Sequence, residues 1–131
     1  MDRKRAERVL TEHFQSHPEV AAVYLFGSVA VERSRPDSDV DVGVLYRTAP
    51  PATLLGQPYA QEAELGERLG CPVQLVVMNS APVDLVHRIL RDGVLLVEHD
   101  RSARIAFEVR ARNAFFDLLP VLRQYRKAVS A

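Results

Sequence analysis

Four residues in the first third of the chain have the types and the spacing of a metal and phosphate site. They are Gly27, Ser28, Asp39 and Asp41, within the segment GSVAVERSRPDSDVDVGVLY of residues 27–46. Residues i and i+2 of a strand share a face, so the two carboxylates are expected to point the same way and to repel each other unless a cation lies between them. Mg²⁺ is the expected cation, because it binds proteins through one or two carboxylates together with substrate phosphates.

Two strand-like segments are needed to position these residues. A continuous apolar run, Val20 to Phe26, directly precedes Gly27 and is typical of a strand buried on both faces; Asp39 to Tyr46 is the second strand. The turn between them would direct backbone N–H groups of Gly27 and Ser28 at phosphates. On the simpler alternative, Gly27-Ser28 is an ordinary turn and the two acids are solvated charges at the edge of a sheet.

The rest of the chain alternates between helical and strand-like patterns. Further strands are expected at residues 73–78 and 94–98, and helices at residues 3–16, 29–33, 58–69, 82–91, 102–119 and 121–129. Ser28 is the expected cap of the helix 29–33, Asn79 or Ser80 is the expected cap of the helix 82–91, and Pro120 is expected to break or kink the last helix. This order predicts an α/β fold, a mixed sheet of about four strands with helices packed on it.

The motif GS-x10-D-x-D between two strands resembles the signature of the minimal nucleotidyltransferases, a small branch of the DNA polymerase beta superfamily. The resemblance continues through residues 73–82, which look like the third strand of that family, and residues 103–128, which look like its closing helix. It implies a polymerase-beta-like nucleotidyltransferase core. It also implies transfer of a nucleotide from ATP or another nucleoside triphosphate to a hydroxyl, with Mg²⁺ or Mn²⁺. Several members are antitoxins encoded beside a HEPN-domain ribonuclease, which they adenylylate or bind.

The resemblance assigns roles to individual residues. The metal would be held by Asp39 and Asp41, and the nucleotide by Gly27, Ser28, Ser38 and Arg35. Arg35 and its neighbour Arg33 are candidates because a guanidinium fork suits phosphate oxygens; their alternative is a solvated loop. Glu32 departs from the family, which often has glycine there, and it adds negative charge near the phosphate turn.

A second departure concerns the third carboxylate that enzymes of this superfamily use, on the neighbouring strand. Gln74 occupies that position, and strand parity places it on the face opposite to Val73 and Leu75. Glutamine can offer an oxygen to a metal but cannot accept a proton, and the loss of a general base costs roughly 10²–10⁴ in rate. The chain is therefore a slow enzyme, an enzyme whose base comes from elsewhere, or a nucleotide-binding pseudoenzyme. Possible replacement acids are Glu62, Glu64 and Asp84.

Composition narrows the alternatives. The 131 residues are expected to form a single domain, 1–131, and the balance of 17 basic and 17 acidic residues argues against bulk binding of nucleic acid. No His/Cys cluster has zinc spacing, and the four histidines are expected at or near the surface. No apolar run is long enough for a membrane span, so we expect no membrane association and a cytoplasmic location.

The leading hypothesis is an Mg²⁺-dependent nucleotidyltransferase, most simply an adenylyltransferase acting on a protein hydroxyl, which serves as the antitoxin of a HEPN partner. The alternative is a catalytically weak or dead antitoxin that acts by direct contact. A transferase of the aminoglycoside type is disfavoured because 131 residues leave no second domain for such a substrate. The aromatic residues near the C-terminus are expected in the core, or else at an interface with a HEPN protein or a second copy; they are Phe107, Phe115, Phe116 and Tyr125.

Overall fold

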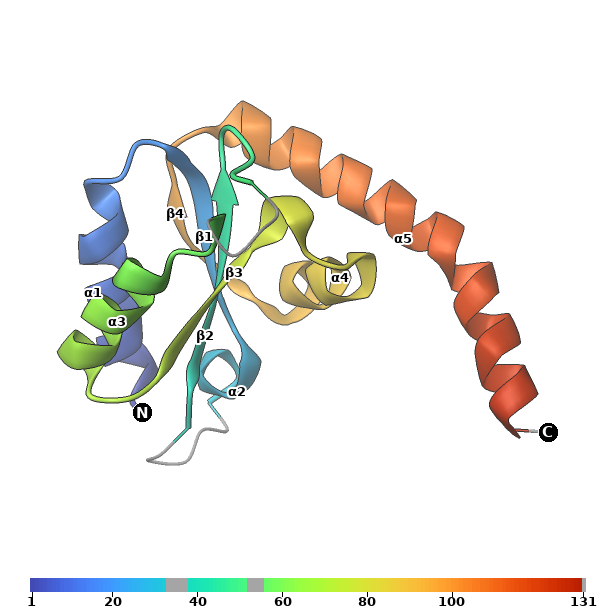
Figure 1. The fold of residues 1–131 in the computed structure, drawn as a ribbon, viewed down its shortest axis with the longest axis horizontal. Helices are drawn as coiled ribbons and strands as arrows, with labels where there is room; N and C mark the ends of the chain where they lie inside the picture. The colour runs from blue at the N-terminus through green and yellow to red at the C-terminus, as the bar shows by residue number, and fades with distance from the viewer. Residues whose placement is uncertain (33–37, 52–55, 131) are drawn as a thin grey trace.

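A four-stranded mixed sheet forms the centre of the computed structural model, which describes residues 1–32, 38–51 and 56–130 (Figure 1). The strands are β1 (Val20–Phe26), β2 (Val40–Tyr46), β3 (Val73–Val77) and β4 (Val94–Glu98). Their order across the sheet is β3-β2-β1-β4; β1 is antiparallel to both of its neighbours, and β2 is parallel to β3. The predicted α/β fold with a mixed sheet of about four strands is confirmed.

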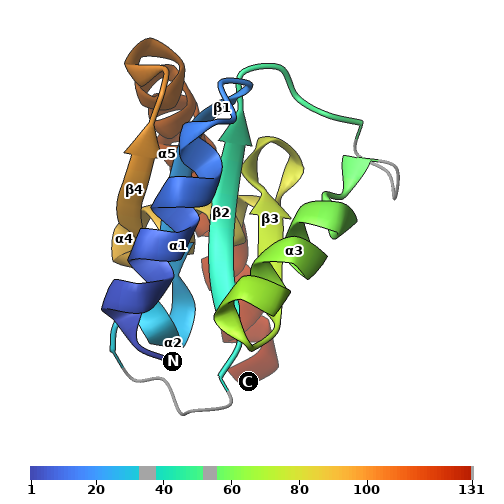
Figure 2. The same ribbon diagram turned by 90° about the vertical axis from the view of Figure 1, so that its left-hand side faces the viewer.

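Helices cover both faces of the sheet (Figure 2). On one face lie α1 (Arg3–Gln15) and α3 (Tyr59–Leu69), and on the other lie α4 (Val83–Asp92) and the first half of α5 (Arg101–Ser130). The short helix α2 (Gly27–Ala30) follows β1, and a single 3₁₀ turn, η2 (Met78–Ser80), follows β3. Strand alternation divides the apolar residues between the two layers, so that Leu25 packs with α1 and α3 while Tyr24 packs toward α4 and α5.

The ends of several elements have clear local causes. Asp2 caps α1, because its side chain accepts a hydrogen bond of 3.3 Å from the backbone N–H of Lys4. Gly70 ends α3 in the left-handed conformation, with φ of 72°, where the absence of a Cβ removes the steric cost.

The predicted helix caps are wrong in two places. α2 begins at Gly27, with no side-chain cap, so Ser28 lies inside the helix. α4 also starts without a side-chain cap, after Pro82. Asn79 instead brackets the end of β2: its Oδ1 accepts from the Tyr46 N–H and its Nδ2 donates to the Tyr46 carbonyl, both at 2.9 Å. The Asn79 side chain therefore binds the backbone N–H and carbonyl of Tyr46 and does not cap α4.

The last helix is continuous through Pro120, so the expected break is absent. Its first half is anchored to the sheet, because the Tyr24 hydroxyl donates to Glu108 at 2.6 Å and Arg104 bonds both Glu108 and Glu98. Burial, followed by the Glu108 carboxylate, raises the pKa of Tyr24 well above its usual value. The second half extends away from the sheet and its covering helices (Figure 1).

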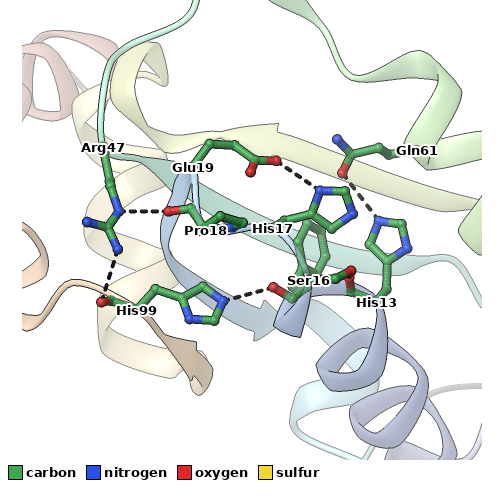
Figure 3. A network of polar contacts seen from close by, with 9 residues as sticks. His13, Ser16, His17, Pro18, Glu19, Arg47, Gln61 and His99 are labelled. Atoms are coloured by element: carbon green, nitrogen blue, oxygen red, sulfur yellow. Dashed lines mark hydrogen bonds and ion pairs between the residues drawn. The ribbon is translucent and has the colours of Figure 1, made fainter.

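A polar network joins the segments at the end of the sheet where β2 and β4 finish (Figure 3). His99 Nε2 lies 2.9 Å from the Phe14 carbonyl, which can only accept, and Arg47 donates to the carbonyls of Pro18 at 2.7 Å and His99 at 3.2 Å. These bonds tie the end of α1 to the segments that follow β2 and β4. The surface prediction is wrong for one histidine, since His13 is buried, with its ring stacked on that of His17.

Candidate functional site

The three strands that carry the candidate residues present them in one row. Phe26, the last residue of β1, pairs with Asp41 of β2, and Asp41 pairs with Gln74 of β3. This alignment arises because β1 runs antiparallel to β2 while β3 runs parallel to it, so the end of β1 meets the beginnings of the other two. Residues in register share a face, here the face covered by α4 and α5.

Gly27 makes the close approach at the centre of the site possible. Its φ of +76° lies in the left-handed region, and a Cβ built there would overlap Oδ2 of Asp41. Any side chain at position 27 would therefore be strained and would displace the Asp41 carboxylate. The turn after β1 consequently requires glycine, and it packs the backbone directly against an acid of the motif.

The electrostatics of Asp41 favour a cation. Its carboxylate is half-buried. Burial raises the pKa of this carboxyl above its usual value, the negative charge of nearby Asp39 raises it further, and the Arg88 guanidinium opposes both. Asp39 itself lies exposed just before β2. A divalent ion between the two carboxylates would relieve both the desolvation and the repulsion.

A cavity of about 580 Å³ opens at this row of residues, a volume within the range of small-molecule sites. It is lined by Phe26, Gly27, Val31, Asp41, Gln74, Val76, Leu85, Arg88 and Asp92. Three of the sequence-predicted residues, Gly27, Asp41 and Gln74, thus share one cavity. The side chain of Gln74 is exposed into this region rather than packed in the core.

The other candidates lie elsewhere. Among the described residues, three other candidates do not line the cavity: Ser28, Ser38 and Asp39. Ser28 and Ser38 are half-buried, and each is next to a motif residue in the sequence. Arg35 lies outside the described residues, as does Arg33. Glu32 is exposed, with φ of 58°.

None of the three proposed replacement acids lines the cavity. Glu62 is fully engaged: one oxygen accepts from the Leu75 N–H at 3.0 Å and the other from Gln57 Nε2 at 3.1 Å. Glu64 and Asp84 are exposed on α3 and α4. Within residues 1–32, 38–51 and 56–130, no three His, Cys, Asp or Glu side chains gather closely enough to enclose a metal on their own.

The sequence pattern did not reveal two charged residues of the cavity, Arg88 and Asp92, both on α4. They fall on the polar side of an amphipathic helix, where charges are ordinary. Arg91 holds Asp92 through two hydrogen bonds of 3.0 and 2.8 Å, and this pairing lowers the pKa of Asp92. Arg88 makes no hydrogen bond or ion pair with a described residue, so its charge faces the cavity uncompensated by contact.

The family relationship follows from a sequence model described as Polymerase beta, Nucleotidyltransferase, which matches residues 9–102. The chain belongs to this family. The matched region contains β1, β2 and β3 with all the candidate site residues. No match was found among curated protein sequences.

Solved structures agree with this nucleotidyltransferase fold. A chain from a toxin–antitoxin complex with AMP-PNP is 21% identical, with a TM-score of 0.81, and the alignment covers 95% of this chain and 98% of that one. A chain from the complex of a tri-AMPylated Shewanella oneidensis HEPN toxin with an MNT antitoxin is 20% identical, with a TM-score of 0.77 and coverage of 98% and 99%. A minimal nucleotidyltransferase is 30% identical over 72% of this chain and 95% of its own, with a TM-score of 0.55.

Substitution Asp41→Asn is predicted to stabilise the protein at pH 7 in the presence of EDTA, by less than about 1 kcal/mol because the carboxylate is only half-buried. The folded state holds the Asp41 proton to a higher pH than the unfolded chain does. The wild type therefore loses stability as the pH rises from the usual carboxyl pKa to the raised one, and the variant does not. Urea unfolding across this pH range measures the effect.

Asp117→Asn, on the exposed surface of α5, is the matched control and should leave the stability unchanged. An Asp41→Asn protein that is less stable than the wild type at pH 7 without metal would contradict the proposed electrostatic cost.

Proposed function

We propose that this nucleotidyltransferase transfers AMP from ATP to a hydroxyl of a partner protein of the HEPN class, with Mg²⁺ or Mn²⁺ as cofactor. The observation that carries the proposal is the single cavity that brings Gly27, Asp41 and Gln74 together from three strands. Membership of the family supports the reaction type. The AMP-PNP and tri-AMPylated-toxin complexes of the similar chains support the choice of nucleotide and acceptor.

The residues present fit a hard divalent cation. Asp39 and Asp41 would supply carboxylate oxygens, and the amide oxygen of Gln74 is a further candidate ligand of the same hard type. Burial and the charge of Asp39 raise the pKa of Asp41, and a cation at this carboxylate would oppose both effects. When bound, the ion would neutralise charge on the phosphates as the α-phosphate is displaced in line.

The chain's own groups bind and orient the nucleotide. The backbone at Gly27 lies against Asp41, so phosphates held by N–H groups at Gly27 and Ser28 would lie beside the metal ligands. Arg88 faces the same cavity and suits a phosphate oxygen. Ser38 and Arg35 remain candidate contacts.

ATP with Mn²⁺ is predicted to raise the melting temperature, with a stabilisation of about 2.7 kcal/mol at a ligand concentration of 100 times Kd. The double substitution Asp39→Asn with Asp41→Asn should abolish this shift, because both proposed metal ligands are then lost. Differential scanning fluorimetry makes the measurement, with Glu64→Gln on the outer side of α3 as the control. An unchanged shift in the double variant would rule out these two ligands.

A second candidate function follows from Gln74, which lies next to Asp41 in the ladder and cannot serve as a base. Within the described residues, the only other carboxylate lining the cavity is Asp92, and Arg91 already holds both of its oxygens. The chain would then bind nucleotide with little turnover and act on its partner by contact.

Gln74→Asp separates the two functions. Restoring a carboxylate beside Asp41 should raise AMP transfer, by up to roughly 10²–10⁴ if the acid acts as general base. The measurement is incorporation of label from ATP into the protein encoded by the neighbouring gene. Gln74→Glu tests whether a carboxylate on a longer side chain has the same effect. Fast transfer by the wild type, with a neutral or harmful effect of the aspartate, would show that Gln74 does not replace a catalytic acid.

The second half of α5 supports a protein partner. Two aromatic residues expected in the core are instead exposed there, Phe116 at 58% and Tyr125 at 68%. Val121, Tyr125 and Val129, spaced four residues apart, form one exposed apolar stripe along the helix that projects from the sheet (Figure 1), whereas Phe116 faces the other side of that helix. Phe107 and Phe115 are half-buried, and Phe115 stacks on His87 with ring centroids 3.5 Å apart. Exposed aromatic residues on a projecting helix are typical of an interface.

Charge distinguishes between the possible partners of this helix. After residue 108 the chain has five basic residues and one acidic residue, whereas the first 108 residues have 12 basic and 16 acidic ones. Two copies of α5 would repel each other, so the helix suits a different protein with an apolar surface flanked by acids.

Val121→Glu with Tyr125→Glu is predicted to weaken the complex with the neighbouring gene product at least tenfold, because it places charge in the apolar contact and reduces the local positive charge. Ile105→Glu, an exposed apolar position on the anchored half of α5, is the matched control. Size-exclusion chromatography with light scattering, at two salt concentrations, gives the stoichiometry. A complex insensitive to the double variant would place the interface elsewhere.

A further inference from the structure

A second cavity continues the nucleotide cavity beyond the edge of the sheet. Its volume is about 410 Å³, and it shares Gln74, Val76 and Leu85 with the cavity that contains Asp41. Its remaining walls include Gln57, Tyr59, Glu62, Ser80, Ala81 and Pro82. Since β3 is the edge strand, the two cavities form one groove that runs from Gly27 across β2 and β3 to Tyr59 and Ser80.

The order of the strands determines which end of the groove can hold the leaving group and which end can hold the attacking hydroxyl. Gly27 follows β1, Asp41 is on β2 and Gln74 is on β3, so the proposed phosphate turn, metal ligand and second cavity succeed one another in that order. Displacement at phosphorus requires the attacking and leaving oxygens to lie roughly in line. If the leaving pyrophosphate is held at Gly27, the attacking hydroxyl must approach from the side of Gln74, where the second cavity lies.

The charges of the second cavity restrict what can bind there. Among the described residues, no Lys, Arg or His lines it, and its one carboxylate, Glu62, is already satisfied by two donors. Val76, Ala81, Pro82 and Leu85 give it an apolar floor. The Tyr59 side chain, 57% exposed, and Ser80 offer neutral polar groups at its rim. A nucleic-acid end would bring phosphates with no cation to meet them, whereas an uncharged side chain fits.

The wall of this cavity is rigidly held. Gln57 Nε2 donates to the Leu75 carbonyl at 2.9 Å, while Glu62 accepts from the Leu75 N–H at 3.0 Å. The two side chains also bond each other at 3.1 Å. Together they satisfy the outer backbone edge of β3 at the residue after Gln74, so they fix the strand and block its pairing with another strand. The acceptor therefore meets a preorganised surface.

We propose that this second cavity is the acceptor subsite, and that it takes an uncharged polypeptide segment carrying the reactive hydroxyl. The inference rests on the proposed function. In the transfer, the hydroxyl oxygen bonds to the α-phosphorus, the bond from that phosphorus to the bridging oxygen breaks, and pyrophosphate leaves toward Gly27. The hydroxyl proton passes to water, because Gln74 cannot accept it.

Ser80→Trp tests the subsite by filling it from an exposed position, with Glu67→Trp on the outer side of α3 as the matched control. The expected result is at least a tenfold loss of AMP transfer to the neighbouring gene product, measured in both the wild-type and the Gln74→Asp backgrounds. The thermal shift with ATP and Mn²⁺ should be unchanged. Unchanged transfer, or loss of the thermal shift in Ser80→Trp alone, would overturn the assignment, the latter because the cavity would then hold the nucleotide.

A second measurement does not depend on turnover. A photoreactive phenylalanine analogue in place of Ser80 should crosslink, in the assembled complex, to a partner peptide that contains a hydroxyl side chain, and mass spectrometry locates that peptide. The absence of such a crosslink in an intact complex would also overturn the proposal. Failure of the proposed function is distinguishable, because AMP transfer would then be absent from the wild type, from Gln74→Asp and from the Glu67→Trp control alike, whereas failure of the subsite alone would leave transfer intact in Ser80→Trp.

Discussion

The candidate site depends on the contact between the backbone at Gly27 and the carboxylate of Asp41. Because Gly27 has positive φ and no Cβ, the chain can leave β1 and turn across the start of β2 at a distance that a side chain would prevent. This turn places the proposed phosphate-binding segment beside the proposed metal ligand. The antiparallel pairing of β1 with β2 and the parallel pairing of β2 with β3 then extend the row to Gln74.

The same arrangement has an electrostatic cost. Asp41 is half-buried near Asp39, so its pKa is raised, and the Arg88 guanidinium on α4 opposes this shift. On the proposed function, a bound divalent cation would offset the repulsion between these carboxylates, so ligand binding would stabilise the fold through Asp41.

The two faces of the sheet divide the structural tasks. The layer of α1 and α3 is apolar and well buried. Glu62 of α3 and Gln57 before it hold β3 through hydrogen bonds to the backbone of Leu75. The layer of α4 and α5 is incomplete: it leaves room for the cavity, contributes Arg88 and Asp92, and carries a helix that extends past the sheet. Among the described helices, none has both the length and the apolar character needed to cross a membrane.

Local patterns in the sequence determined the four strands and most of the helices, because strand alternation, helical periodicity and glycine or proline at the ends are properties of short segments. They also determined the GS-x10-D-x-D motif and, through strand alternation, the face on which Gln74 lies, whereas the register that pairs Asp41 with Gln74 came from the structure. The capping role expected of Ser28 failed because α2 already begins at Gly27, and that of Asn79 failed because the backbone of Tyr46, distant in sequence, binds its side chain. Only the tertiary structure could show that the Glu62 carboxylate binds the backbone of β3 and does not line the cavity with Asp41. It likewise decided that Arg88 and Asp92 line that cavity, and that Phe116 and Tyr125 lie outside the core. Each of these depends on which elements pack together, and a helix surface shows the same polar or apolar pattern whether its partner is its own sheet, a cavity or another protein.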